Sequence, residues 1–162
     1  MDGLQAVCKW LEQTPVGASV RQSLWLFPAI ETVHLVGMAA LLATVGAFDL
    51  RLMGVAMNGQ SISGLGRRLL PWTWAAFAVQ VVTGGLLFSS EATRMLRNPA
   101  FRMKMLLIAL AGVQALIFQV AARRNPPGRI GETPRVQERI AGFVSLVLWI
   151  GVVAAGRWIG FI

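Results

Sequence analysis

Four long apolar runs, separated by short segments that hold nearly all the charged residues, constrain this sequence more than any other feature. The chain is 56% hydrophobic and only 14% charged, whereas a soluble domain carries about a quarter charged residues. A run of about 20 apolar residues forms a helix long enough to cross the hydrocarbon core of a bilayer. The pattern therefore predicts an all-α, polytopic membrane protein built as a four-transmembrane-helix bundle.

Each of the four predicted spans has a signal for the start of a helix, which in the fourth is Thr133 as candidate cap followed by Pro134. The spans cover approximately residues 28–48, 71–89, 99–122 and 136–160. Pro28, Pro71 and Pro99 lie in the first turns of their predicted helices. A backbone N–H at that position has no acceptor within the helix, so proline, which lacks it, is tolerated there. Asn98, directly before Pro99, is a candidate N-cap. A loop rich in Pro, Gly and Arg is predicted over residues 122–135.

Residues 1–22 form an N-terminal segment ahead of the transmembrane domain, residues 23–162. Leu4, Val7 and Leu11 recur there at helical spacing, and polar side chains fill most of the other positions. The segment is predicted to form a short amphipathic helix that lies at the membrane interface.

The basic residues indicate a lipid partner rather than nucleic acid. The net charge is +8, but most basic side chains flank the apolar runs, where they meet lipid head groups. Four spans put both termini on one side, with seven basic residues there and eight on the other side. Setting aside Arg102, Lys104 and Arg157, which fall within spans, widens this bias and favours an N-out/C-out orientation.

Two ionisable residues lie inside the first predicted span. Glu31 and His34, the only histidine, are three residues apart and so share a helix face. Charged groups at bilayer depth usually face the bundle interior and have a partner. Arg102 and Lys104 open the third span from the same side of the membrane. We therefore predict a polar site of these four residues, with Glu31 paired to Arg102 or Lys104.

Several functions fit such a site. A neutral imidazole is a common axial ligand of haem, and Gly37, one turn from His34, would let a flat macrocycle approach. His34 with Met38 at i+4 is a set that suits copper. A cluster of Glu, His and Lys is also typical of a proton relay. In a purely structural interpretation, Glu31 is an ion-pair partner and His34 a hydrogen-bonded interior residue.

Other polar and small residues in the spans are expected to have structural roles. Asp49 and Arg51 mark the end of the first span and are expected to pair locally. Helix-to-helix hydrogen bonds are expected from Gln80, Gln114 and Gln119. The fourth span holds two small-x-x-x-small pairs, which let helices approach closely. They serve either contacts within the chain or an interface to a second copy or a larger membrane complex. The members of these pairs are Gly151 with Ala155 and Gly156 with Gly160.

Three segments resemble a family of uncharacterised bacterial four-helix membrane proteins, over roughly residues 20–160. They are "WLFPAIETVHLVGMAALLATVGAFDLRLMG", "LLPWTWAAFAVQVVTGGLLF" and "NPAFRMKMLLIALAGVQALIF". This resemblance implies a multi-pass protein of the bacterial inner (cytoplasmic) membrane.

A more distant resemblance is carried by His34, by "DLRLMG" at the end of the first span and by Lys104. The pattern is similar to HemJ-type protoporphyrinogen oxidases and to the CopD-type copper-resistance membrane domain. HemJ-type proteins bind haem b, and a first-span histidine and a third-span lysine matter for activity. The resemblance thus implies His34 as haem ligand and Lys104 as functional lysine. The HemJ-type third-span histidine has no counterpart, because its candidate positions hold Gln114 and Gln119.

The function expected first is therefore a haem b-binding or electron-transfer-associated membrane subunit. Its cofactor-binding residues would be His34, Lys104, Glu31 and Arg102. The second expectation is a copper- or metal-handling membrane protein that uses His34 and Met38. The third is a non-catalytic scaffold subunit of a larger membrane complex. Enzymatic activity stays open between these expectations.

Overall fold

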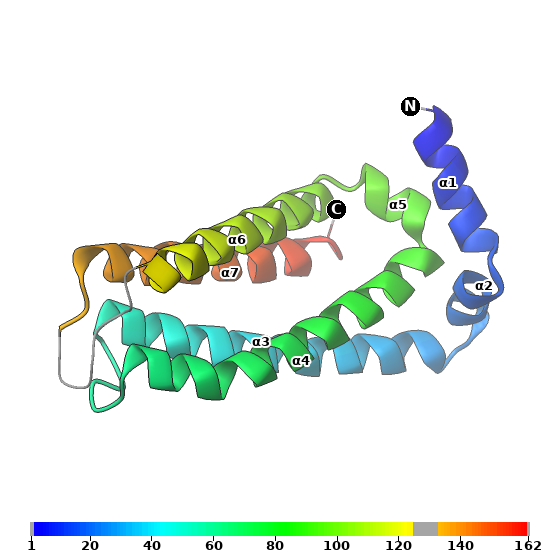
Figure 1. The fold of residues 1–162 in the computed structure, drawn as a ribbon. Helices are drawn as coiled ribbons and strands as arrows, with labels where there is room; N and C mark the ends of the chain where they lie inside the picture. The colour runs from blue at the N-terminus through cyan, green and yellow to red at the C-terminus, as the bar shows by residue number, and fades with distance from the viewer. Residues whose placement is uncertain (1, 125–132, 162) are drawn as a thin grey trace.

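The four predicted spans are four long helices arranged as two hairpins. The computed structural model describes residues 2–124 and 133–161, which form seven α-helices and no strand. Four of these are long and apolar enough to cross a membrane: α3 (Leu26–Met53), α4 (Ile62–Ser90), α6 (Pro99–Arg124) and α7 (Val136–Trp158). In Figure 1 the α3–α4 hairpin forms one layer and the α6–α7 hairpin the other. The all-α membrane architecture is thereby confirmed.

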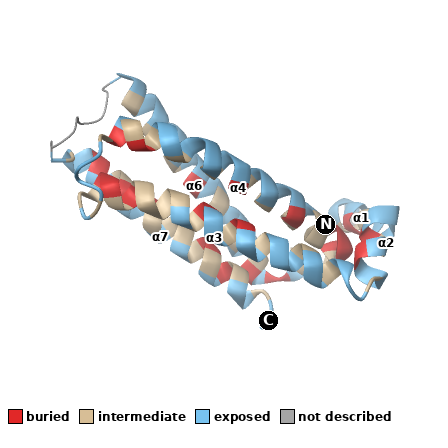
Figure 2. Ribbon diagram, turned by 90° about the horizontal axis from the view of Figure 1, so that it is seen from below, coloured by how far each residue is buried: buried red, intermediate tan, exposed pale blue. Residues whose placement is uncertain are grey.

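The backbones of the two hairpins come close along one helix pair, α3 with α7. Helix α6 packs its backbone against α7 and meets α3 and α4 through aromatic side chains: Phe118 lies against Phe48 and Phe101 against Phe88, with ring centroids 6.0 Å and 5.4 Å apart. Exposed residues cover most of the surface of the long helices (Figure 2), as expected for apolar helices that lie in lipid. Between α4 and α6 the backbones stay apart, and the stacked rings of Phe88 and Phe101 join the two helices.

A glycine allows the close approach of α3 and α7. A Cβ atom added at Gly142 of α7 would lie 2.7 Å from the Asp49 carbonyl oxygen and 2.9 Å from the Leu52 Cβ atom of α3. No side chain fits between two helix backbones at this distance. Gly142 therefore sets the spacing of the close backbone contact between the hairpins.

Three short helices gather at the end of the bundle where the chain begins. Helix α1 (Asp2–Gln13) occupies the segment in which an amphipathic helix is predicted, and it lies across the ends of the long helices (Figure 1). Thr14 then caps α2 (Pro15–Gln22), with its Oγ1 atom accepting from the Gly17 N–H at 3.2 Å. Neither α2 nor α5 (Ala92–Arg97) is predicted from the sequence.

The start of α4 differs from the prediction. The helix begins at Ile62, so Pro71 lies inside it rather than in its first turn. The Ser61 hydroxyl accepts from the Gly64 N–H at 3.0 Å and caps the earlier start. Membrane helices tolerate an internal proline, because neighbouring groups satisfy the backbone atoms that it frees.

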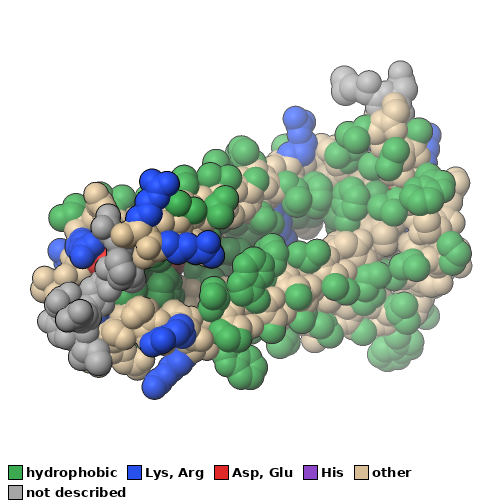
Figure 3. All heavy atoms as spheres, in the orientation of Figure 1, with side chains coloured by type: hydrophobic (Ala, Val, Ile, Leu, Met, Phe, Trp, Pro, Cys, Tyr) green, Lys and Arg blue, Asp and Glu red, His purple; other side chains and the backbone are tan. Residues whose placement is uncertain are grey.

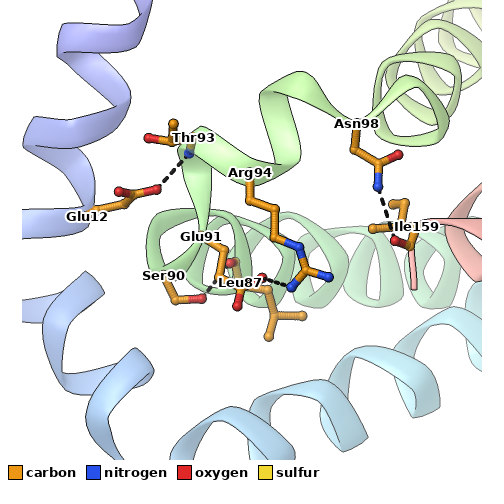
Figure 4. Close-up of polar contacts among 8 residues, drawn as sticks. All are labelled: Glu12, Leu87, Ser90, Glu91, Thr93, Arg94, Asn98 and Ile159. Carbon is orange, nitrogen blue, oxygen red and sulfur yellow. Dashed lines mark hydrogen bonds and ion pairs between the residues drawn. The ribbon is translucent and has the colours of Figure 1, made fainter. Parts of the chain in front are cut away.

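The start of α6 agrees with the sequence signal. Asn98 Oδ1 accepts from the Ala100 N–H at 2.9 Å and from the Phe101 N–H at 3.3 Å, which makes Asn98 the N-cap. Its Nδ2 atom donates to the Ile159 carbonyl at 3.1 Å (Figure 4). This bond ties the start of α6 to the end of α7. The predicted loop before α7 lies mostly at residues 125–132, outside the described residues.

Candidate functional site

His34 lies half-buried where α3 faces α4, and two hydrogen bonds hold it there. Its Nδ1 atom is 2.7 Å from the Thr83 Oγ1 atom. The Gln80 Nε2 atom donates to the His34 carbonyl at 2.6 Å. Gly84 gives the ring room, since a Cβ atom there would stand 3.4 Å from the His34 Cε1 atom. Both the ring and the backbone of His34 are therefore fixed by one face of α4.

The hydrogen bonds of Thr83 determine the tautomer of the imidazole. The Thr83 hydroxyl donates to the Val79 carbonyl at 2.6 Å, and a hydroxyl has only one proton to give. When that proton goes to the Val79 carbonyl, Thr83 Oγ1 accepts from the Nδ1–H of His34. A neutral imidazole with its proton on Nδ1 carries its lone pair on Nε2. The Nε2 atom makes no hydrogen bond with a described residue and is not fully buried.

Lys104 faces His34 from the other hairpin. It lies half-buried on α6, where a Cβ atom on Gly156 of α7 would stand 3.3 Å from its Nζ atom. Its positive charge acts on the imidazole of His34. No hydrogen bond or ion pair links Lys104 to any residue within 2–124 or 133–161.

The α6 backbone stays apart from the backbones of α3 and α4, and the ring pairs Phe88–Phe101 and Phe48–Phe118 bridge the two layers. Figure 3 shows the molecule hollowed between its two layers. The structure thus brings together two of the four predicted residues, one from each hairpin. They present a free imidazole nitrogen and a free ammonium group.

Glu31 and Arg102 do not join them. Both side chains are exposed, and neither forms an ion pair with any described residue. The predicted pairing of Glu31 with Arg102 or Lys104 is therefore wrong. Glu31 lies about 60° around α3 from His34, which turns it away from α4. It is also near the helix start, where lipid head groups and water are within reach.

Met38 lies half-buried on α3, one turn beyond His34. Among the described residues, no group of three His, Cys, Asp or Glu side chains is placed to hold a metal ion. A metal ion bound by His34 and Met38 would therefore find no group of His, Cys, Asp or Glu ligands among the described residues to complete its coordination.

Thr83 is the residue that sequence reasoning missed. The sequence does contain a signal for it: Thr83 lies three residues after Gln80 and therefore shares with Gln80 the helix face that packs on α3. The interhelical roles expected of Gln80 and Gln114 are confirmed, the latter by a 3.0 Å bond to the Ala141 carbonyl.

Gly37 does not serve the purpose expected of it. A Cβ atom there would lie 2.9 Å from both the Gln80 Nε2 atom and the Val79 Cγ1 atom. The space beside Gly37 is therefore already filled by α4 and is closed to a flat ligand. Gly85, by contrast, has no atom within 4 Å of an added Cβ.

Asp49 and Arg51 form a second polar group, at the far end of α3. They are 2% and 0% exposed and do not pair, because residues two apart lie on opposite sides of a helix. The Ser145 hydroxyl bonds to the Asp49 carboxyl group, and Arg51 Nε donates to the Gln60 carbonyl at 2.8 Å. The Asp49 Oδ2 atom and both Arg51 Nη atoms have no partner among the described residues. The expected local pair is thus wrong.

The small residues of α7 are used within the chain. A Cβ atom added at Gly151 would meet the Leu107 Cδ1 atom at 3.2 Å, and Gly156 faces Lys104. Both glycines therefore face α6.

Comparison with known proteins gives one match. The model of a family described as "Family of unknown function (DUF6644)" matches residues 16–162. No curated protein and no solved structure matches the chain.

Proposed function

Because the chain belongs to the DUF6644 family, whose function is unknown, we propose its function from the site itself. The protein is a membrane subunit that binds haem b between its two hairpins and takes part in electron transfer. His34 supplies an axial ligand through Nε2. The protein lies in the bacterial inner membrane, with both termini outside. The distant resemblance to HemJ-type proteins is part of this proposal.

The observation that carries the proposal is the hydrogen bond from His34 Nδ1–H to Thr83. Histidine ligands usually donate the N–H that does not bind the metal to a protein acceptor, which fixes the tautomer and orients the ring. Thr83 does this for His34, and it leaves Nε2 facing the open space. An imidazole placed only for packing has no need of a free, accessible lone pair.

The other residues fit a flat, anionic cofactor better than a bare metal ion. A copper site on His34 and Met38 is the weaker proposal, because no group of three His, Cys, Asp or Glu ligands is present among the described residues. The α4 and α6 backbones stay apart, and a planar ring would enter from lipid between the Phe88–Phe101 and Phe48–Phe118 ring pairs. The unpaired ammonium of Lys104 can neutralise a carboxylate of a ligand held by His34. Bound haem supplies a one-electron redox centre.

The test is the absorption spectrum of the chain, extracted in a mild detergent from cells supplied with a haem precursor. Wild-type protein is expected to show a Soret band, and His34→Ala is expected to lose it. Glu31→Ala, an exposed residue on the same helix, is the matched control and should keep the band.

Other outcomes of this experiment would overturn the proposal. A colourless wild-type protein with bound copper would support the metal-handling function instead, with His34 and Met38 as copper ligands. A colourless, metal-free protein that co-purifies with a larger complex would support the scaffold function.

A further inference from the structure

A second open space lies far from His34, at the end of the bundle where α1, α2 and α5 gather. It is a shallow surface cavity of about 500 Å³, wide open on one side and lined by three arginines, two glutamates and two residues with hydroxyl groups. These residues come from α1, α2, α5 and the end of α4. None belongs to the site between the hairpins.

Both glutamates in the wall are already engaged. Glu12 Oε1 accepts from the Thr93 N–H at 2.7 Å, and Glu91 Oε2 bonds to Arg94 Nη1 at 3.0 Å (Figure 4). The remaining arginines, Arg21 and Arg97, form no ion pair with any residue that the structure describes. The lining therefore carries three guanidinium groups against two carboxylates, a surplus of one positive charge, and Arg21 and Arg97 are free to bind an anion.

The Thr93 hydroxyl is a further polar group without a partner. It is buried in the wall of the cavity and makes no hydrogen bond with a described residue. Buried polar groups are nearly always hydrogen-bonded, so this hydroxyl is an exception in the wall of the cavity.

Exposed tryptophans place this end of the molecule at the level of lipid head groups. Trp25 directly precedes α3, Trp158 ends α7, and Trp10 lies on α1; all three are exposed. Tryptophan is enriched where the hydrocarbon core meets the head groups. The cavity thus lies where lipid phosphates are abundant.

We propose that this cavity binds the phosphate group of an anionic glycerophospholipid, with Arg21 and Arg97 donating to its oxygens. Planar guanidinium groups match phosphate oxygens in charge and geometry. An anionic lipid suits the surplus charge better than phosphatidylcholine, whose choline cation would enter the same arginine-rich space.

The experiment uses the full chain, freed of lipid in a neutral detergent. Its Tm is followed while phosphatidylglycerol, phosphatidylcholine or inorganic phosphate is added, since a ligand that binds only the folded state raises Tm. Arg21→Gln with Arg97→Gln is the test variant. The matched control is Arg67→Gln with Arg68→Gln, two exposed arginines at the opposite end of the bundle.

Phosphatidylglycerol should raise the Tm of wild type and control more than phosphatidylcholine does. The test variant should bind it about 25-fold more weakly, at about fivefold for each arginine near a membrane surface. Arg97→Lys keeps the positive charge and serves as a second variant in case the double variant folds poorly. Its affinity for phosphatidylglycerol should lie between that of wild type and that of the test variant.

A response to inorganic phosphate equal to that of the lipid would assign the cavity to a soluble phosphate compound. Equal lipid responses of the test variant and the control would overturn the proposal. So would a wild-type protein that responds to neither phosphatidylglycerol nor phosphate.

Discussion

Thr83→Val is expected to weaken haem binding by about 10–100-fold while His34 itself stays in place. Valine has nearly the shape of threonine but lacks the hydroxyl that accepts from His34 Nδ1–H. The ring then loses the group that orients it, and its proton is free to move to Nε2, the nitrogen that must bind iron. A spectrophotometric haem titration of the purified protein measures the loss.

The matched control is Thr73→Val in the same helix. Thr73 donates to the Leu69 carbonyl at 3.0 Å, just as Thr83 donates to the Val79 carbonyl, but it has no partner on α3. Both variants lose the same intrahelical bond, and only Thr83→Val loses the contact with the imidazole. Equal haem affinities in the two variants would show that Thr83 does not position His34.

Gly142→Ala is expected to lower the stability of the fold by about 1–3 kcal/mol, the usual cost of adding an atom to a filled contact. The added Cβ atom would stand 2.7 Å from the Asp49 carbonyl oxygen, a backbone atom that cannot move without moving α3. Because α3 and α7 form the close backbone contact between the hairpins, the packing of one hairpin on the other must adjust. Thermal unfolding in detergent, followed by tryptophan fluorescence, reports the change.

Gly46→Ala separates this effect from helix propensity. Gly46 lies on α3, and an added Cβ atom there has no atom within 4 Å. Alanine in a helix interior is favoured over glycine by about 1 kcal/mol, so this variant should be as stable as wild type or more so. If Gly142→Ala unfolds at the same temperature as Gly46→Ala, the close approach of α3 and α7 does not limit stability.

The sequence predicted those features that depend on composition along the chain. The four spans follow from runs of apolar residues, and the start of α6 follows from Asn98 beside Pro99. Pro71 misled the prediction of α4, because the Ser61 cap and the residues after it extend the helix upstream of the proline.

The sequence did not predict the features that depend on how each helix is rotated and which helix it packs against. His34 and Glu31 share a broad face of α3, yet α4 contacts the former and leaves the latter exposed. Lys104 and Arg102 differ in the same way on α6. Which residue turns inward depends on the rotation of each helix against its neighbours, and a single sequence does not encode this rotation in a local pattern.

The most direct test of the account uses the single histidine of the chain. Protein labelled with ¹⁵N-histidine gives one Nδ1 and one Nε2 signal, and their chemical shifts in the cofactor-free protein at alkaline pH identify the neutral tautomer. Hydrogen bonding to Thr83 predicts a proton on Nδ1 and a bare Nε2. A proton on Nε2 would contradict the account, because His34 would then have no lone pair facing the space between the hairpins.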